Sequence, residues 1–345
     1  MLYHSVHIGP LVLPGNLFLA PVAGYSDRAF RAVCHEGGAD FAYTEMVSAE
    51  ALVRGSGKTE ALMARAPDEP AYAVQLFGGN PETVGAAVRI VLEKTDAECI
   101  DVNAGCPVPK IVKTGAGASL TRDPDRLYSV LKAATDAVRN YEGGRPYMSG
   151  RASLSGPVPV TVKIRSGWDA QHMTWKEAAQ AAVQAGVSAL TVHPRTRAQG
   201  YEGQSDWTIL KQIVEFTDGK IPVFGSGDIF LPEDARAMLE ETGCAAVMFA
   251  RGAMGHPFIF RQTRQLLETG RYDGIEPGER ITAGFRELHL LIQDRGEDVA
   301  CREMRKRFCA YSRGLPGGAE LRRQIVSADT ETEFQNIFVP YMHAS

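Results

Sequence analysis

The sequence predicts an α/β protein in which a (β/α)8 barrel is followed by a small, all-helical C-terminal domain. Eight short apolar runs rich in β-forming residues lie between about residue 17 and residue 270, and segments with helical spacing separate most of them. Apolar strands that alternate with amphipathic helices indicate a parallel sheet covered by helices, and eight such units over about 250 residues are typical of the barrel. After residue 270 only helical patterns follow. An open doubly wound sheet is the alternative, and it is disfavoured because no GxGxxG motif opens the first helix.

Each predicted strand ends in glycine or in a polar residue. The eight runs are LFLAPVAG (17–24), FAYTEMVS (41–48), YAVQLFGG (72–79), CIDVNAGC (99–106), VTVKIRSG (160–167), ALTVHPR (189–195), IPVFGSGD (221–228) and AAVMFARG (245–252). The clearest helical segments open near Ser, Asn, Thr or Pro and close near Gly or Thr, as helix-capping preferences predict. They are SDRAFRAVCHEGG (26–38), NPETVGAAVRIVLEKT (80–95), TWKEAAQAAVQAG (174–186) and LPEDARAMLEETG (231–243).

The interval between the fourth and fifth strands is unusually long. About 60 positions separate their starts, whereas most neighbouring starts are about 24 to 32 positions apart. The excess has two parts, the stretch NAGCPVPKIVKTGAGASL (103–120) and a Gly/Ser/Pro-rich segment (143–159) that we expect to form a surface insertion. The sequence therefore predicts a barrel domain over 1–270 and a helical domain over 271–345.

Composition limits the class of protein. Hydrophobic residues make up 44% and charged residues 23%, as in an ordinary soluble globular protein, and the N-terminus lacks the features of a signal peptide. We therefore expect a cytoplasmic protein without a membrane span. The six cysteines form no CxxC pair and no cluster with histidine, so neither a disulfide framework nor a structural metal is indicated. Only Cys106 lies in a loop-like setting, between a glycine and a proline.

Charge is unevenly distributed along the chain. The formal net charge is −4, which argues against indiscriminate binding to nucleic acid. From Cys301 to Arg323, however, seven basic residues stand against two acidic ones. A basic segment of this kind is either a solvated helix face or a local surface for a polyanion.

The ends of the predicted strands carry the candidate functional residues, because active sites of this barrel lie at the C-terminal ends of its strands. These residues are Pro21 and Gly24, Glu45, Gln75, Asn103 and Cys106, Lys163 and Arg165, His193 and Arg195, Gly225 to Gly227, and Arg251 and Gly252. The last two runs end in GSGD and ARG, glycine-containing turns where this fold commonly binds phosphate. Either turn could also be a tight connection with no ligand.

Lys163 needs a partner if it points into the barrel, because burying an unpaired ammonium is costly. A side chain that reaches the barrel mouth is the alternative. Together with Gln75 and His193, Lys163 could bind the polar edge of a flavin ring whose phosphate lies in the glycine turns. The residues alone do not decide between these possibilities.

Motifs in a fixed order along nearly the whole chain resemble those of the tRNA-dihydrouridine synthases, particularly the bacterial B-type members. They are LAPVAGYSDRAFR, NAGCPVPKIVKTGAGASL, VTVKIRSGWD, LTVHPRTRAQGYEGQSDW, IPVFGSGDI, ARGAMGHPFIF and REMRKRFCAYSRGLPGGAELR. The resemblance implies FMN at the barrel mouth, NADPH as its reductant and a helical domain that grips tRNA. It also implies hydride transfer from FMN N5 to C6 of a flipped-out uridine and protonation of C5 by Cys106.

The resemblance assigns further roles to residues of this chain. A thiol suits the acid role of Cys106, since its unperturbed pKa of about 8.5 leaves it protonated at neutral pH. The implied FMN-binding residues are Pro21, Val22, Gln75, Lys163, His193, Gly225, Ser226, Gly227, Arg251 and Gly252. The residues expected near uridine or tRNA are Asn103, Lys110, Arg165, Arg195, Arg197, Arg302, Arg305 and Lys306. The chain departs from the family pattern at GSGD, where GNGD is usual, and at RKRF (305–308), where RKH is usual.

Two other functions remain open at this point. One is an FMN-dependent pyrimidine oxidoreductase of the dihydroorotate dehydrogenase type, which would share the barrel and phosphate turns but not need a basic helical domain. The other is a tRNA-binding protein without catalysis, which would not need Cys106, Lys163 and His193. We expect a monomer in each case.

Overall fold

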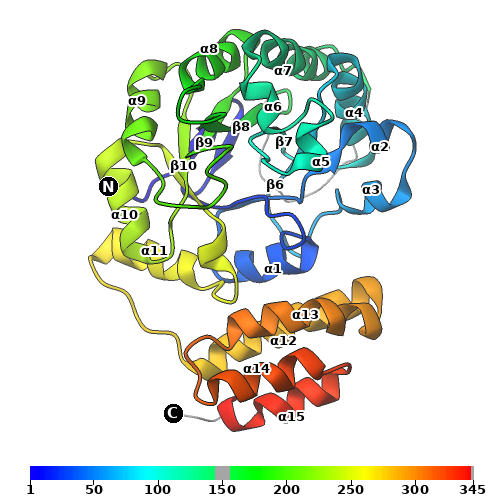
Figure 1. Cartoon of the computed structure of the whole chain (residues 1–345), viewed down its shortest axis with the longest axis vertical. Helices are drawn as coiled ribbons and strands as arrows, with labels where there is room; N and C mark the ends of the chain where they lie inside the picture. Colours follow the sequence, from blue (N-terminus) through cyan, green and yellow to red (C-terminus); the bar gives the residue numbers. More distant parts are fainter. Residues whose placement is uncertain (144–155, 343–345) are drawn as a thin grey trace.

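A computed structural model describes residues 1–143 and 156–342 of the chain. It contains a closed barrel of parallel strands surrounded by helices, with a group of C-terminal helices packed beneath it (Figure 1). The barrel strands are β3 (Leu17–Leu19), β4 (Phe41–Tyr43), β6 (Tyr72–Phe77), β7 (Cys99–Ala104), β8 (Val160–Gly167), β9 (Ala189–Thr196), β10 (Val223–Ser226) and β11 (Ala246–Phe249). Neighbours in the chain pair in parallel, and β11 pairs with β3 to close the barrel. The predicted (β/α)8 barrel is confirmed.

The run 41–48 differs from the expectation of a single strand. It forms β4 and a separate two-residue strand, β5 (Val47–Ser48), and both pair with β6. Between them the Thr44 hydroxyl donates to the carbonyl oxygen of Glu45 at 2.8 Å and accepts from the backbone N–H of Gln75 at 3.1 Å. These side-chain bonds lie where β4 ends, before β5 pairs with β6 again.

Side-chain caps start some of the barrel helices: Asp27 accepts from the Phe30 N–H, and Asn80 accepts from the Thr83 N–H. The four quoted helical segments form α1 (Arg28–Glu36), α4 (Pro81–Lys94), α8 (Trp175–Ala185) and α10 (Pro232–Thr242). The remaining barrel helices are α2 (Ala49–Val53), α3 (Gly57–Ala61), α5 (Pro109–Val112), α6 (Ala118–Thr121), α7 (Pro124–Arg139), α9 (Trp207–Thr217), the 3-10 turn η1 (Arg251–Ala253) and α11 (Ile259–Thr269). Helices α5 to α7 occupy the long interval before β8; most of the expected insertion (143–159) lies outside the described residues.

Aromatic side chains and an N-terminal hairpin fill the lower end of the barrel. Phe18 contacts Phe41 and Phe224 edge-to-face, with ring centroids 5.6 and 5.2 Å apart. The antiparallel strands β1 (Val6–Ile8) and β2 (Leu11–Leu13) pack on this layer. The N-terminal ends of the strands are thereby closed, which leaves the C-terminal ends as the place for a cavity.

The C-terminal helices are α12 (Pro277–Arg295), α13 (Glu297–Tyr311), α14 (Gly318–Ser327) and α15 (Glu331–Met342). Their core is a cluster of rings in which Phe308 lies 4.7 to 5.1 Å from Phe285, Phe334 and Phe338. Helix α1 of the barrel faces α12 and α13 (Figure 1). None of the helices in the described ranges combines the length and apolar character needed to cross a bilayer.

Candidate active site

A cavity of about 420 Å³ opens at the C-terminal ends of the barrel strands. Its lining comes from side chains of β6, β7, β8, β9, β10 and β11 and from the loops after β3, β7, β9, β10 and β11, as expected for this fold. The sequence-predicted residues that line it are Pro21, Val22, Gln75, Asn103, Cys106, Lys163, Arg165, His193, Ser226, Gly227 and Arg251. Residues from seven separate segments of the chain therefore meet in one place.

Hydrogen bonds to its loop hold Cys106 at the cavity wall. The Asn103 side-chain oxygen accepts from the backbone N–H groups of Gly105 and Cys106 at 3.2 and 2.9 Å. The Arg165 guanidinium donates to the carbonyl oxygen of Gly105 at 2.9 Å. A side chain at Gly117, whose φ is +60°, would lie 2.7 Å from the Cys106 carbonyl oxygen. The glycine therefore lets the loop close behind Cys106.

The Cys106 thiol remains protonated at neutral pH. Burial raises its pKa, and the Val108 N–H, Arg165 and Lys163 only partly oppose this. A protonated thiol that faces a cavity can donate its proton to a bound molecule, and the two cations can stabilise the thiolate that forms.

A buried polar network below the cavity orients Gln75. Its amide N–H donates to Asp101 Oδ2 at 2.7 Å, and its amide oxygen accepts from Asn103 at 2.9 Å. Asp101 is fully buried and also accepts from the Thr161 hydroxyl at 2.6 Å. Because Asn103 also holds the Cys106 loop, this network joins the barrel interior to the thiol.

Sequence reasoning did not identify Asp101 as part of the site. The signal available was a carboxylate in the middle of the apolar run CIDV, where burial requires a partner. Tyr201 and Asp228, which also line the cavity, were missed as well.

Lys163 lines the cavity and makes no side-chain hydrogen bond within the described part of the chain. Burial, with a smaller effect of the Arg165 charge, lowers its pKa to about 8, and Asp101 partly opposes this shift. The amine is thus mostly protonated at pH 7 and retains its capacity to donate.

His193 is a neutral imidazole. Burial lowers its pKa well below the usual range, and the charges of Lys163, Arg165, Arg195 and Arg251 lower it further. Arg195 can only donate, so its contact with His193 Nε2 at 3.3 Å makes Nε2 the acceptor and leaves the ring proton on Nδ1.

Arg195, which was expected near the substrate, lies against His193 and Asp228, two residues that line the cavity. It is 1% exposed, and its five N–H groups are all engaged. The acceptors are Glu202 O, Gly203 O, His193 Nε2 and the two oxygens of Asp228. Arg195 therefore positions His193 and Asp228 and has no donor left for a substrate.

The two glycine turns lie side by side. Gly227 has a φ of +112°, and a Cβ there would lie 2.8 Å from the His193 ring. A Cβ at Gly252 would lie 2.3 Å from the Ile229 carbonyl oxygen, so its absence lets the turns after β10 and β11 approach. A Cβ at Gly225 would lie 2.4 Å from Met238 Sδ, toward the surrounding helices. Gly225 and Gly252 thus have packing roles, and their phosphate contact stays a prediction, whereas Ser226 and Gly227 line the cavity.

Arg251 lies at the edge of the cavity next to these turns. It donates to Asp228 at 3.2 Å, and its guanidinium lies 4.9 Å from the ring centroid of Tyr201 and 5.0 Å from that of Phe230. Burial acts to raise the pKa of Asp228, but hydrogen bonds from Arg195 and Ser205 and the charges of the two arginines lower it. Asp228 is therefore ionised and restrains both arginines.

The remaining predicted residues lie outside this cavity. Lys110 is exposed on α5, and Arg197 stacks on Trp168 with 4.8 Å between guanidinium and ring. Arg302 and Arg305 form ion pairs with Asp298 and Asp329. Lys306 is exposed and donates to the Gly24 carbonyl oxygen at 2.6 Å.

The basic segment 301–323 is less uniform than its sequence suggests. Arg307 was counted with it as a charge available to a polyanion, but it is 1% exposed and paired with Asp27 and Glu287. Its charge is therefore used inside the protein.

Comparison with known proteins shows which family the chain resembles. A family model described as dihydrouridine synthase (Dus) matches residues 18–343. A probable tRNA-dihydrouridine synthase of Treponema pallidum is 53% identical over 96% of this chain and 95% of its own length. The tRNA-dihydrouridine synthase B of Pseudomonas aeruginosa is 36% identical over 92% and 90%, respectively.

Solved structures support the fold. DHODH from Eimeria tenella in complex with ferulenol superposes with a TM-score of 0.55 at 16% identity, covering 76% of this chain and 83% of that one. Histamine dehydrogenase from Rhizobium sp. 4-9 gives 0.51 at 12% identity, covering 84% and 51%. At these identities the likeness concerns the barrel alone. The family match and the curated relatives establish that the chain is an enzyme of the dihydrouridine synthase family.

Proposed function

We propose that the protein reduces uridine in tRNA to 5,6-dihydrouridine, with FMN bound in the cavity and NADPH as the source of electrons. One observation carries the proposal: a protonated thiol, held by Asn103 and Arg165, faces the same cavity as the cation Lys163 and the neutral His193. The relatives named above act on tRNA according to their names, and they cover almost the whole chain.

The cavity residues fit FMN. The Lys163 ammonium has no hydrogen-bond acceptor among the described residues. It is therefore available to bind the electron-rich edge of a flavin ring. Gln75 and His193 add polar groups that could bind the ring. At the edge of the cavity, the Arg251 cation and the backbone of the Ser226–Gly227 turn could bind the phosphate. FMN, when bound, would supply the hydride that uracil receives at C6.

Cys106 would supply the proton that completes the reduction. Addition of hydride to C6 of uracil breaks the C5–C6 double bond and leaves negative charge on C5 and O4. The thiol protonates C5 as this charge develops, and Arg165 and Lys163 stabilise the resulting thiolate, which recovers a proton from solvent. The sum is uridine, NADPH and one proton giving dihydrouridine and NADP⁺.

A second cavity, of about 530 Å³, is lined by residues of the barrel and of the helical domain, and it is the proposed path of the tRNA backbone. Lys306, Arg313 and Arg322 line it, and Met254 lines both this cavity and the active-site cavity. A polyanion held by these cations would pass close to the barrel mouth. We therefore propose that residues 1–270 catalyse the reaction and residues 271–345 bind tRNA, in a cytoplasmic enzyme that acts as a monomer.

The test is to incubate purified protein with NADPH and unmodified tRNA and to analyse the nucleosides by mass spectrometry. We expect uridine to gain two hydrogens and the purified protein to show flavin absorption. Reduction of orotate or oxidation of dihydroorotate, without any reaction on tRNA, would instead support an enzyme of the dihydroorotate dehydrogenase type. A colourless protein that binds tRNA and leaves uridine unchanged would support binding without catalysis.

A further inference from the structure

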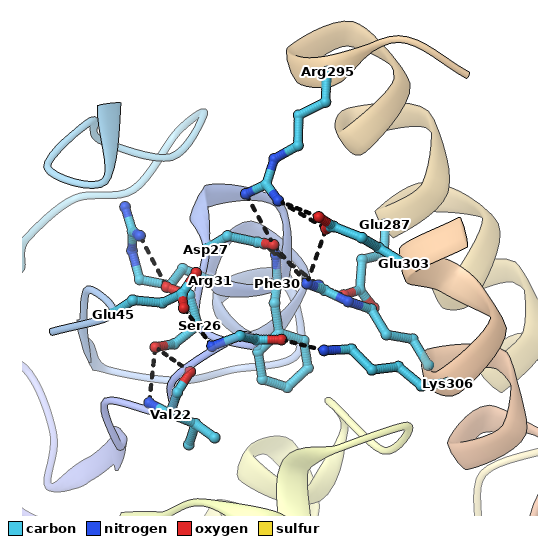
Figure 2. Close-up of polar contacts among 12 residues, drawn as sticks. Val22, Ser26, Asp27, Phe30, Arg31, Glu45, Glu287, Arg295, Glu303 and Lys306 are labelled. Carbon is cyan, nitrogen blue, oxygen red and sulfur yellow. Dashed lines mark hydrogen bonds and ion pairs between the residues drawn. The ribbon is translucent and has the colours of Figure 1, made fainter. Parts of the chain in front are cut away.

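The junction between the barrel and the helical domain contains a buried group of ion pairs. Figure 2 shows Asp27, at the start of α1, pointing toward the side chains of the helical domain. Asp27 Oδ1 accepts from the Phe30 N–H at 3.0 Å and so caps α1, while Oδ2 accepts from Arg307 at 2.6 Å. One carboxylate therefore both begins a barrel helix and binds the other domain.

Arg307 is the centre of this group. It lies on α13, is 1% exposed, and also donates to Glu287 of α12, which is fully buried and accepts from Tyr311 at 2.8 Å. Arg295 binds Glu303 at 2.7 Å and reaches Asp27 at 3.4 Å. Removing one partner of a buried ion pair leaves the other charge uncompensated, so the two domains are strongly held in this arrangement.

A short turn connects this junction to the active-site cavity. Val22 lines the cavity, and its N–H donates to Ser26 Oγ at 2.9 Å, while the Ser26 N–H donates back to the Val22 carbonyl oxygen at 2.9 Å (Figure 2). Lys306 of α13 donates to Gly24 in the middle of this turn at 2.6 Å. A shift of α13 would therefore act directly on the cavity wall.

A second contact between the barrel and α13, one turn further along the helix, fixes the same geometry without charge. Gly255 has a φ of +71°, and a Cβ there would lie 2.3 Å from the Ala310 carbonyl carbon and 2.5 Å from the Tyr311 nitrogen. The barrel turn and the α13 backbone are thus in direct contact. The preceding residue, Met254, lines both cavities.

We propose that Asp27 and Arg307 are positioning residues, which fix the orientation of the helical domain over the substrate cavity and thereby determine which uridine of tRNA reaches Cys106. This inference rests on the proposed function. The basic side chains that would hold tRNA belong to the same domain, so a small rotation of that domain moves every distant part of a bound tRNA relative to the cavity.

The test uses Asp27→Asn in the full-length, flavin-loaded enzyme. Asparagine can still accept the Phe30 N–H and cap α1, but it removes the charge that Arg307 binds. Glu98→Gln is the matched control: Glu98 is a buried carboxylate that binds Arg65 at 2.7 Å and the Tyr72 N–H at 3.0 Å, at the opposite end of the barrel. Three quantities are measured: flavin reduction by NADPH without tRNA, KM for tRNA, and the position of dihydrouridine in the product.

We expect Asp27→Asn to leave flavin reduction unchanged, to raise KM for tRNA by about tenfold, and to spread modification to other uridines, while Glu98→Gln changes none of these. Gly255→Ala should give the same pattern, since it displaces α13 without removing a charge. The inference would be overturned if folded Asp27→Asn and Gly255→Ala both kept the wild-type KM for tRNA and the wild-type position of dihydrouridine. It would also be overturned if flavin reduction by NADPH fell as much as turnover of tRNA. If the wild type itself reduces no uridine, the proposed function fails, which is a distinct result.

Discussion

Replacement of Asp101 by asparagine should stabilise the protein at neutral pH. Asp101 is fully buried beneath the cavity and accepts hydrogen bonds from Thr161 and Gln75 at 2.6 and 2.7 Å. Asparagine has the same shape and can keep both contacts, because its oxygen can accept from Gln75 and its amide can donate to the rotatable Thr161 hydroxyl.

The magnitude follows from the pKa of Asp101. Burial raises this pKa from 3.8 to about 6, and the hydrogen bonds and Lys163 oppose the rise only in part. The folded protein then binds the Asp101 proton more tightly than the unfolded chain does, so the contribution of Asp101 to stability is greatest below about pH 4 and falls as the pH rises through 6. About two pKa units correspond to about 3 kcal/mol lost above pH 6, which asparagine avoids.

Urea denaturation of wild type and Asp101→Asn at pH 4, 5, 6 and 7 measures this effect. We expect equal free energies of unfolding at pH 4, where both side chains are neutral, and a variant more stable by up to about 3 kcal/mol at pH 7. A variant that is less stable at pH 7, or a difference that does not change with pH, would refute the argument.

Two further predictions concern the Cys106 loop and the tRNA surface. Gly117→Ala places a methyl group 2.7 Å from the Cys106 carbonyl oxygen, so uridine reduction should fall by about tenfold or more while flavin reduction by NADPH persists. Gly219→Ala, at a φ of +69° in open space, controls for backbone strain, and equal activity of the two variants would contradict the role given to Gly117. Lys306→Ala and Arg322→Ala should each weaken tRNA binding and lower its salt slope by about one, whereas exposed Lys220, before β10, should be neutral on replacement by alanine. Unchanged binding of the first two over a range of salt concentrations would exclude the cavity between the domains as the tRNA path.

The barrel could be predicted because its strands are continuous apolar runs and because some of its helices, such as α1 and α4, start at side-chain caps. The location of the cavity could be predicted because the C-terminal ends of the strands meet at one end of this barrel. Residues as distant in the sequence as Pro21 and Arg251 line the cavity together. The break between β4 and β5 could not be predicted, since it depends on a hydrogen bond between Thr44 and the backbone of Gln75, a pairing that sequence spacing does not contain.

The sequence did not show which charged residues form ion pairs inside the protein. Arg195 and Arg307 looked like cations available to a substrate, but each is bound by carboxylates from distant parts of the chain. Helical spacing offered a signal for Arg307, because Met304, Phe308 and Tyr311 share its face of α13 and all are buried. No such signal marks Arg195, whose partner Asp228 becomes adjacent only when β9 and β10 pair.

The most direct test of the account compares wild type with Cys106→Ala in two separate steps. Flavin reduction by NADPH is followed without tRNA, and dihydrouridine formation is then followed by mass spectrometry after unmodified tRNA is added. We predict that both proteins are reduced by NADPH at similar rates, and that only the wild type converts uridine to dihydrouridine efficiently. Full conversion by Cys106→Ala would contradict the assignment of Cys106 as the acid, and no conversion by flavin-loaded wild type would contradict the proposed reaction itself.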